Sequence, residues 1–218
     1  MKFKGFDPDG RVRIYFTNMP HWRQEGCTYF VTYRLADSIP MNVLSGWEDD
    51  KVQWLLANGI SVPDRAKWQE GFTKLDPVQR GAFLKYFNRE LNTYLDQGRG
   101  SCLLRSPDAA AIVLAGWGHF DGTRYDLGDL VVMPNHVHLL VTPRKGFDLE
   151  KILQSRKRQS ARAINALVGR SGELWQKHSY DHIVRDELEL LAFQKYIAEN
   201  PAKGCVPKGE YAHRSFDW

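Results

Sequence analysis

Residues 125–142 read YDLGDLVVMPNHVHLLVT, and this stretch decides the fold. Tyr125–Met133 and His136–Thr142 are rich in aliphatic residues, and each segment has the length of an ordinary strand. Pro134 and Asn135 lie between them and are typical of a turn. The stretch therefore predicts two strands joined by a turn.

The segments on either side of this stretch carry further helix and strand patterns. Thr28–Leu35 is β-branched and aromatic and predicts a strand, whereas Asp186 with Glu189 is a capping box that begins a helix stopped by Pro201. We expect the other segments to be a helix over Asp108–Phe120, a helix over Leu149–Gly169, a loop that runs into a short strand over Trp175–Val184, an irregular arm over residues 1–27 and a polar tail. This order predicts an α+β fold, a ferredoxin-like antiparallel sheet with helices on one face.

Residues 38–104 interrupt this order after the first strand. Apolar residues recur at helical spacing in this segment, as in Phe83, Phe87 and Leu91. Asp76 followed by Pro77 is typical of a helix start. We therefore interpret residues 1–218 as a single domain with a helical insertion over residues 38–104.

Composition and charge narrow the class of protein. The net charge of +4 is compatible with a polyanionic partner. Cys27, Cys102 and Cys205 are far apart, which argues against a disulfide framework and against a thiolate zinc site. No apolar run approaches the ~20 residues of a transmembrane helix, and residues 1–10 lack the apolar region of a signal peptide. We expect a cytoplasmic protein without a membrane partner.

The first candidate for chemistry is the pair His136 and His138. Alternate residues of a strand point to the same face, so both imidazoles should project together while Val137 points to the opposite side. Two imidazoles side by side are a natural pair of metal ligands. The alternative is two surface histidines on a half-buried strand, because such short motifs also arise by chance.

The second candidate is Tyr196 with Asn200, four residues apart on the last predicted helix. Residues at this spacing share a helix face, so a phenol and an amide oxygen meet the same neighbour. Together with the two imidazoles they form an open shell of nitrogen and oxygen donors, which suits Mg²⁺ or Mn²⁺. The alternatives are a core tyrosine and a helix-terminal asparagine.

Three stretches together resemble one known family. They are MPNHVHLL at residues 133–140, WQKHSYDHIVRDE at 175–187 and YIAENPAKG at 196–204. The His136-Val137-His138 triplet resembles the HUH motif (histidine, bulky hydrophobe, histidine) of single-tyrosine transposases. In this order the stretches are similar to REP-associated tyrosine transposases, which are relatives of the IS200-like transposases.

The resemblance implies a bacterial, nucleoid-associated enzyme with assigned roles. Tyr196 matches the nucleophile, and His136, His138 and Asn200 match the metal ligands. Lys157 matches a helix lysine near the active site. The implied activity is that of a metal-dependent endonuclease and strand transferase, which cuts single-stranded DNA beside a hairpin. The cut leaves a 5′-phosphotyrosine link and a free 3′-OH.

Positive charge is concentrated after the histidine pair. Residues 144–170 contain eight Lys or Arg against two Asp or Glu, a difference of +6 that exceeds the net charge of the whole chain. This asymmetry favours DNA contact over an ordinary solvated helix face. The candidate DNA-binding residues are Arg156, Lys157, Arg158, Arg162, Arg185 and Trp175. Further candidates for stacking on bases or holding a DNA hairpin are Trp218, Arg11, Arg13, His21, Trp22 and Arg23.

Several alternatives remain open at this point. The main one is a domesticated protein that binds hairpin DNA with little or no catalysis. Tyr180 is a rival nucleophile, and His182 is a weaker candidate for a metal or phosphate contact. A replication initiator often has two tyrosines on one helix, whereas the last predicted helix here has one. A zinc hydrolase requires a third histidine or a carboxylate at ligand spacing. The chain is compatible with a monomer or a homodimer.

Overall fold

The computed structural model of the chain describes residues 3–16, 20–64 and 67–216. Trp218, a candidate for stacking on DNA, lies outside the described residues. The chain forms two compact units: one comprises residues 1–38 with 100–218, and the other comprises residues 39–99. Within the described ranges, none of the helices combines the length and hydrophobicity that a membrane span needs.

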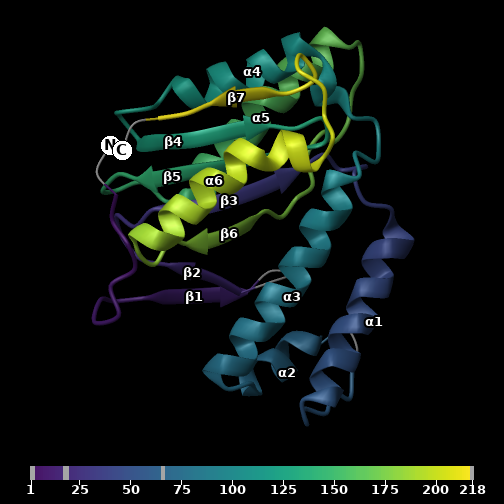
Figure 1. The fold of residues 1–218 in the computed structure, drawn as a ribbon, viewed down its shortest axis with the longest axis vertical. Coiled ribbons are helices and arrows are strands. Elements are labelled where there is room, and N and C mark those ends of the chain that lie inside the picture. Colours follow the sequence, from purple (N-terminus) through teal and green to yellow (C-terminus); the bar gives the residue numbers. More distant parts are fainter. Residues whose placement is uncertain (1–2, 17–19, 65–66, 217–218) are drawn as a thin grey trace. The chain divides into compact units, whose positions relative to one another are not determined.

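The larger unit is built on a five-stranded antiparallel sheet (Figure 1). The strand order is β6-β3-β5-β4-β7, and every residue of the central strand β5 is buried. The predicted α+β class with an antiparallel sheet is confirmed. The strands are β3 (Tyr29–Arg34), β4 (Tyr125–Val132), β5 (His136–Pro143), β6 (Tyr180–Ile183) and β7 (Ala212–Arg214).

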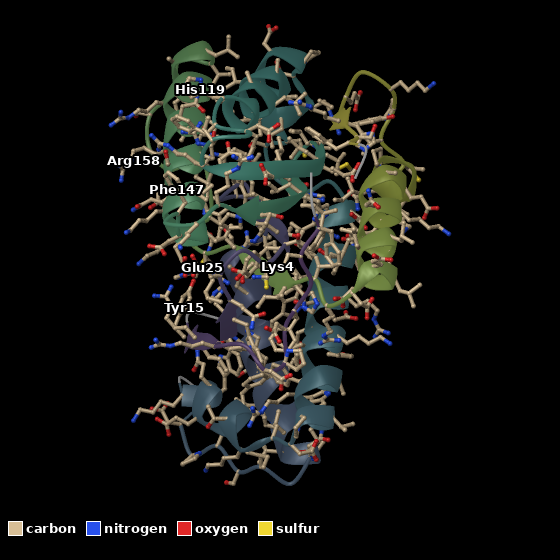
Figure 2. The ribbon with its side chains drawn as sticks, turned by 90° about the vertical axis from the view of Figure 1, so that its left-hand side faces the viewer. Lys4, Tyr15, Glu25, His119, Phe147 and Arg158 are labelled. Carbon is tan, nitrogen blue, oxygen red and sulfur yellow. The ribbon has the colours of Figure 1, made fainter. Side chains whose placement is uncertain are left out.

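Helices cover both faces of this sheet, which differs from the expected arrangement on one face. Helices α4 (Pro107–Gly118) and α5 (Leu149–Leu167) pack on one side, and α6 (Glu187–Lys203) packs on the other. Figure 2 shows α5 and α6 on opposite sides of the strands. The cause is that the strands are apolar on both faces. Phe30 and Leu140 lie on the second face, and a helix must bury them as well.

Local contacts hold α6 against the sheet. Asp186 caps its first turn by accepting a hydrogen bond from the Glu189 amide at 2.8 Å. A bulge in β4 between Leu127 and Leu130 turns Asp129 towards α6, where the Gln194 amide donates to it at 2.8 Å. These contacts set which residues of α6 lie over β5.

The prediction that Pro201 stops this helix is wrong. Helix α6 includes Pro201 and continues to Lys203. A proline ring costs one helical hydrogen bond, but the final turn still closes because the Gly204 amide donates to the Asn200 carbonyl at 3.0 Å. Asn200 is therefore inside the helix and has a defined orientation.

Two segments expected to be irregular contain strands. The arm includes the hairpin of β1 (Arg13–Phe16) and β2 (Pro20–Arg23), and the polar tail includes β7, which pairs with β4 and forms one edge of the sheet. Backbone hydrogen bonds pair the strands of both segments, and a buried polar network also holds β2 of the hairpin.

Asp181 of β6 is the centre of this network. His21 Nδ1 lies 2.6 Å from one carboxylate oxygen, and Arg23 donates to both oxygens at 2.5 and 2.9 Å. Arg23 also pairs with Glu150 of α5 at 3.0 Å. His21 and Arg23 are therefore engaged inside the protein, whereas Trp22 is exposed.

The network predicts a large and pH-dependent contribution to stability. Burial raises the pKa of Asp181, but the hydrogen bonds from His21 and Arg23 lower it further, so the net pKa lies below its ordinary value. We expect Asp181→Asn to lower the free energy of unfolding by about 3 kcal/mol at neutral pH, as measured by urea denaturation. This stabilisation is lost as the pH falls below about 4, through the depressed pKa.

A matched control for this prediction is the exposed pair of Asp126 with Arg144. Asp126→Asn should cost less than about 1 kcal/mol, because solvent screens exposed ion pairs. Equal losses for Asp181→Asn and Asp126→Asn would contradict the interpretation of the buried network.

The smaller unit is helical and has an aromatic core. It contains α1 (Met41–Ala57), α2 (Trp68–Lys74) and α3 (Pro77–Asp96), and residues 39–99 correspond closely to the insertion predicted over 38–104. Asp76 caps α3 in a capping box with Gln79. In the larger unit, the short 3-10 helix η2 (Leu103–Arg105) precedes α4.

Candidate active site

The two histidines of β5 lie side by side on the sheet face that α6 covers. Their ring centroids are 4.5 Å apart, and neither residue is exposed to solvent. In the β3–β5 register, Thr32 is opposite His138 and Arg34 is opposite His136. The predicted projection of both imidazoles to one face is therefore seen in the structure.

Helix α6 brings Tyr196 to this pair. The Tyr196 hydroxyl lies 3.5 Å from His138 Nε2, and the two rings meet edge to face with centroids 5.1 Å apart. Phe30 contacts both the His138 ring and the Tyr196 ring, which fixes their relative position. A phenol from the last helix and an imidazole from β5 thus meet within one chain.

Asn200 lies one helical turn beyond Tyr196 and reaches His136. It is fully buried, and its side chain is close enough to the His136 ring to raise the pKa of that ring. The other ring nitrogen of His136, Nδ1, is 2.7 Å from the Asn135 amide oxygen. Because that oxygen can only accept, Nδ1 carries the proton and a neutral ring has its lone pair on Nε2.

Burial disfavours the charged form of both imidazoles. Burial lowers the pKa of His136 to about 3, although the neighbouring Asn200 side chain partly opposes the shift. Burial and the neighbouring His136 hold the pKa of His138 well below its ordinary value. The Thr32 hydroxyl oxygen lies 2.7 Å from His138 Nδ1 and can accept a hydrogen bond from that nitrogen. Neutral rings held in this way have lone pairs available for a cation.

The donor set fits a divalent cation with open coordination positions. His136, His138 and Asn200 offer two nitrogens and one amide oxygen from neighbouring positions on β5 and α6. In the described part of the chain, no three His, Cys, Asp or Glu side chains gather as a metal site. A mixed shell with an amide oxygen suits Mg²⁺ or Mn²⁺.

The rival candidates from β6 occupy other positions. Tyr180 is partly buried beside Phe30, and burial raises its pKa above the ordinary value, which makes it a weaker nucleophile than an ordinary phenol. His182 is 3.0 Å from Glu189 Oε1, which agrees with an ordinary paired imidazole. Neither residue has the helix-face relation to a ligand that Tyr196 has.

Sequence reasoning missed three neighbours of the site. Lys203 places its ammonium 5.0 Å from the centre of the Tyr196 ring, and it follows Tyr196 by seven residues, a helical spacing that could have identified it. Asn135 directly precedes the histidine pair. Thr32 had no signal in the sequence, because its role depends on the strand register.

The structure separates the candidate DNA-binding residues into buried and exposed ones. Arg156 is buried and donates to the Gly116 carbonyl at 2.7 Å, and Trp175 is buried and donates to Ser160 at 3.0 Å. Lys157 is partly buried and donates to backbone carbonyls. DNA contact by this set stays a prediction, and burial removes Arg156 and Trp175 from the residues that we carry forward.

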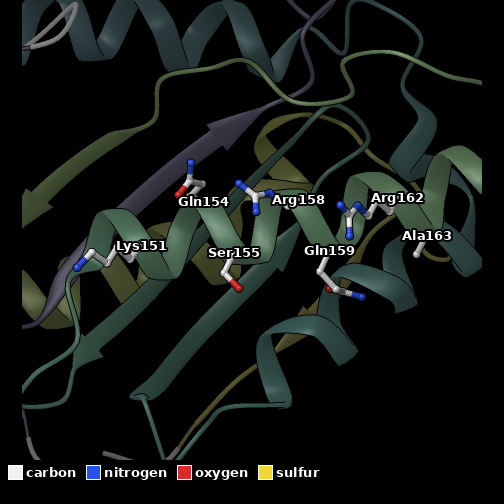
Figure 3. A pocket seen from close by; sticks show the side chains of 7 residues that line it. All are labelled: Lys151, Gln154, Ser155, Arg158, Gln159, Arg162 and Ala163. Carbon is white, nitrogen blue, oxygen red and sulfur yellow. The ribbon is translucent and has the colours of Figure 1, made fainter.

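Arg158, Arg162 and Arg185 are exposed. Arg158 and Arg162 line a shallow surface hollow of α5 together with Lys151 (Figure 3). In Figure 2, Arg158 points away from the sheet on the side opposite to α6. The basic surface of α5 and the tyrosine are thus on different faces of the larger unit.

Comparison with known proteins shows what the part of the chain that holds the site is similar to. Residues 119–200 match the model of a family described as Transposase IS200 like. An uncharacterized protein of Haemophilus influenzae is 26% identical over 98 residues, covering 34% of this chain and 53% of that protein, so the match spans about half of the relative's length. A structure described as the REP associates tyrosine transposase bound to a REP hairpin aligns with a TM-score of 0.46 and 14% identity, over 88% of this chain and 77% of that chain.

The predicted resemblance to IS200-like transposases is confirmed as a similarity over residues 119–200. This segment begins just before β4 and ends at Asn200. It includes both histidines of β5 and Tyr196 of α6.

Proposed function

We propose that this protein is a single-tyrosine endonuclease and strand transferase that acts on single-stranded DNA beside a hairpin. The observation that carries the proposal is the 3.5 Å approach of the Tyr196 hydroxyl to His138 Nε2, with Asn200 beside His136 one turn away. The similarity of residues 119–200 to the IS200-like transposase family supports the same reaction class.

The proposed step is attack of the Tyr196 oxygen on a backbone phosphorus. A bond forms between the tyrosine oxygen and phosphorus, and the bond from phosphorus to the 3′-oxygen breaks. The phenol gives up its proton, and the departing oxygen gains one to become a free 3′-OH. A phenol with an ordinary pKa of ~10 is a weak nucleophile, so the proposed attack requires activation of this hydroxyl.

His136, His138 and Asn200 would hold the Mg²⁺ or Mn²⁺ of this reaction. A bound ion supplies Lewis-acid polarisation of a phosphate oxygen. Asn135 and Thr32 hold the two rings in place, as partners that orient ligands in other metal sites do. Phe30 of β3 and the apolar residues of α6 shield the imidazoles from water.

The test is a trapping assay for the covalent protein–DNA adduct. Labelled hairpin oligonucleotides with single-stranded flanks are incubated with the protein and Mn²⁺ or Mg²⁺, and the products are separated under denaturing conditions. We expect a labelled band at the mass of protein plus cleaved strand. Hairpin binding that survives EDTA, with no adduct under any divalent ion, would favour a binding protein without catalysis.

The exposed cations of α5 give a separate prediction about DNA affinity. We expect the double substitution Arg158→Ala with Arg162→Ala to weaken binding and to flatten its salt dependence. For two lost contacts with a single strand, the slope of log affinity against log salt should fall by about 1.4. The control is Arg89→Ala on α3. An equal fall of the salt slope in this variant would show that net charge alone changes the affinity.

A further inference from the structure

Arg34 is a buried positive charge beside the candidate active site. It is the last residue of β3 and lies directly opposite His136. Alternate residues of a strand share a face, and Thr32, two residues earlier, contacts His138. Arg34 therefore belongs to the same sheet face as the imidazoles, and only 8% of the residue is exposed.

No carboxylate pairs with Arg34 among the described residues. Its Nη1 donates to the Ser38 hydroxyl at 3.0 Å and lies 3.5 Å from the Leu35 carbonyl. Burial lowers its pKa to about 10, and no acidic neighbour opposes that shift. Buried charges are normally paired, because an unpaired charge loses its hydration without compensation. The Nε and Nη2 groups remain available as donors within the described structure.

Lys157 adds a second positive charge from a different element. It belongs to α5 and donates to the Gln176 carbonyl at 2.5 Å and to the Lys177 carbonyl at 3.0 Å. Burial and the charge of Arg34 lower its pKa to about 8. The carbonyl oxygens satisfy its donors but leave its charge uncompensated. The Gln176 amide in turn donates to the Arg34 carbonyl at 2.9 Å, so two elements bring like charges near one another.

We propose that Arg34, supported by the charge of Lys157, binds a backbone phosphate of the DNA strand at the His136 end of the site. The inference rests on the proposed function, because it identifies how that site would hold its substrate. A planar guanidinium with free Nε and Nη2 donors matches two oxygens of a phosphate. Because Tyr196 contacts the His138 end, Arg34 would hold the strand on the other side of the attacked phosphorus.

The experiment is a double-mutant cycle between Arg34 and individual phosphates, measured as binding without cleavage. All proteins carry Tyr196→Phe, and each single-stranded oligonucleotide carries one neutral methylphosphonate linkage. We expect Arg34→Met to weaken binding of the unmodified strand about tenfold. At one position, the methylphosphonate should weaken binding by a similar factor when the protein has Arg34. The same oligonucleotide should bind the Arg34→Met protein no more weakly than the unmodified strand does.

Arg89→Met is the matched control, because it removes one arginine charge from the surface of the helical unit. Arg34→Lys is the second variant if Arg34→Met does not fold, as judged by thermal unfolding. Arg34→Lys keeps the positive charge but loses the planar guanidinium with its paired donors. Most of the affinity loss expected for Arg34→Met should therefore also be seen with Arg34→Lys. Wild-type affinity for Arg34→Lys, or equal losses at every methylphosphonate position, would overturn the inference.

The adduct assay separates this inference from the proposed function. If the wild-type protein forms no adduct but the cycle still couples Arg34 to one phosphate, the cleavage proposal fails and the phosphate contact stands. If the adduct forms and the Arg34 variants bind every oligonucleotide as the control does, the phosphate contact fails alone.

Discussion

Replacing Tyr196 with phenylalanine is expected to abolish the covalent protein–DNA adduct. The substitution removes the only atom of this side chain that can attack phosphorus, so the labelled band should fall below detection rather than weaken. The fold should survive, because the ring contacts with Phe30 and His138 persist. The lost hydroxyl contact is worth about 1 kcal/mol at most. The measurements are adduct trapping, oligonucleotide binding and thermal unfolding on the same preparation.

Tyr180→Phe is the matched control for this prediction. It removes a phenol from the same sheet face but from β6, where the ring packs beside Phe30. We expect its adduct to form at the wild-type level. An adduct that persists in Tyr196→Phe and vanishes in Tyr180→Phe would reverse the assignment of the nucleophile.

Removing one imidazole is expected to have the second-largest effect. His138→Ala deletes one nitrogen of the proposed donor set, so adduct formation should fall at least about 100-fold and should no longer respond to added Mn²⁺. Chelation of the wild-type protein with EDTA should give a similar loss that Mn²⁺ restores. Because His138 is fully buried, its replacement also leaves a cavity, and the thermal midpoint must be measured alongside.

Two further variants separate cation binding from packing. Asn135→Ala keeps both imidazoles but removes the acceptor that orients His136, so about 10–100 times more Mn²⁺ should be needed for half-maximal adduct formation. His182→Ala removes an imidazole that pairs with Glu189, and it should behave as wild type. Full Mn²⁺ stimulation in His138→Ala, with the fold intact, would rule out the proposed donor set.

The features that local periodicity controls could be predicted from the sequence. The projection of His136 and His138 to one face follows from the two-residue repeat of a strand, and the shared face of Tyr196 and Asn200 follows from the helical repeat. The apolar runs around these residues also predicted the sheet. The sequence alone could therefore name the candidate site.

The features that depend on tertiary pairing could not be predicted. The register that puts Arg34 opposite His136 arises from strands far apart in the sequence. The hairpin of β1 and β2 forms around Asp181, and no local pattern predicts that contact. Basic residues of α5 look alike in sequence, yet burial gives Arg156 and Arg158 different surroundings.

A single phenol on α6 has a consequence for the order of events in the proposed reaction. Helix α6 carries one tyrosine, Tyr196, so each copy of the chain can be esterified to only one strand at a time. A second cut by the same copy must wait until an incoming 3′-OH displaces the first strand and frees the side chain. Cutting and rejoining would then alternate on one copy, and two ends held at once would call for two copies.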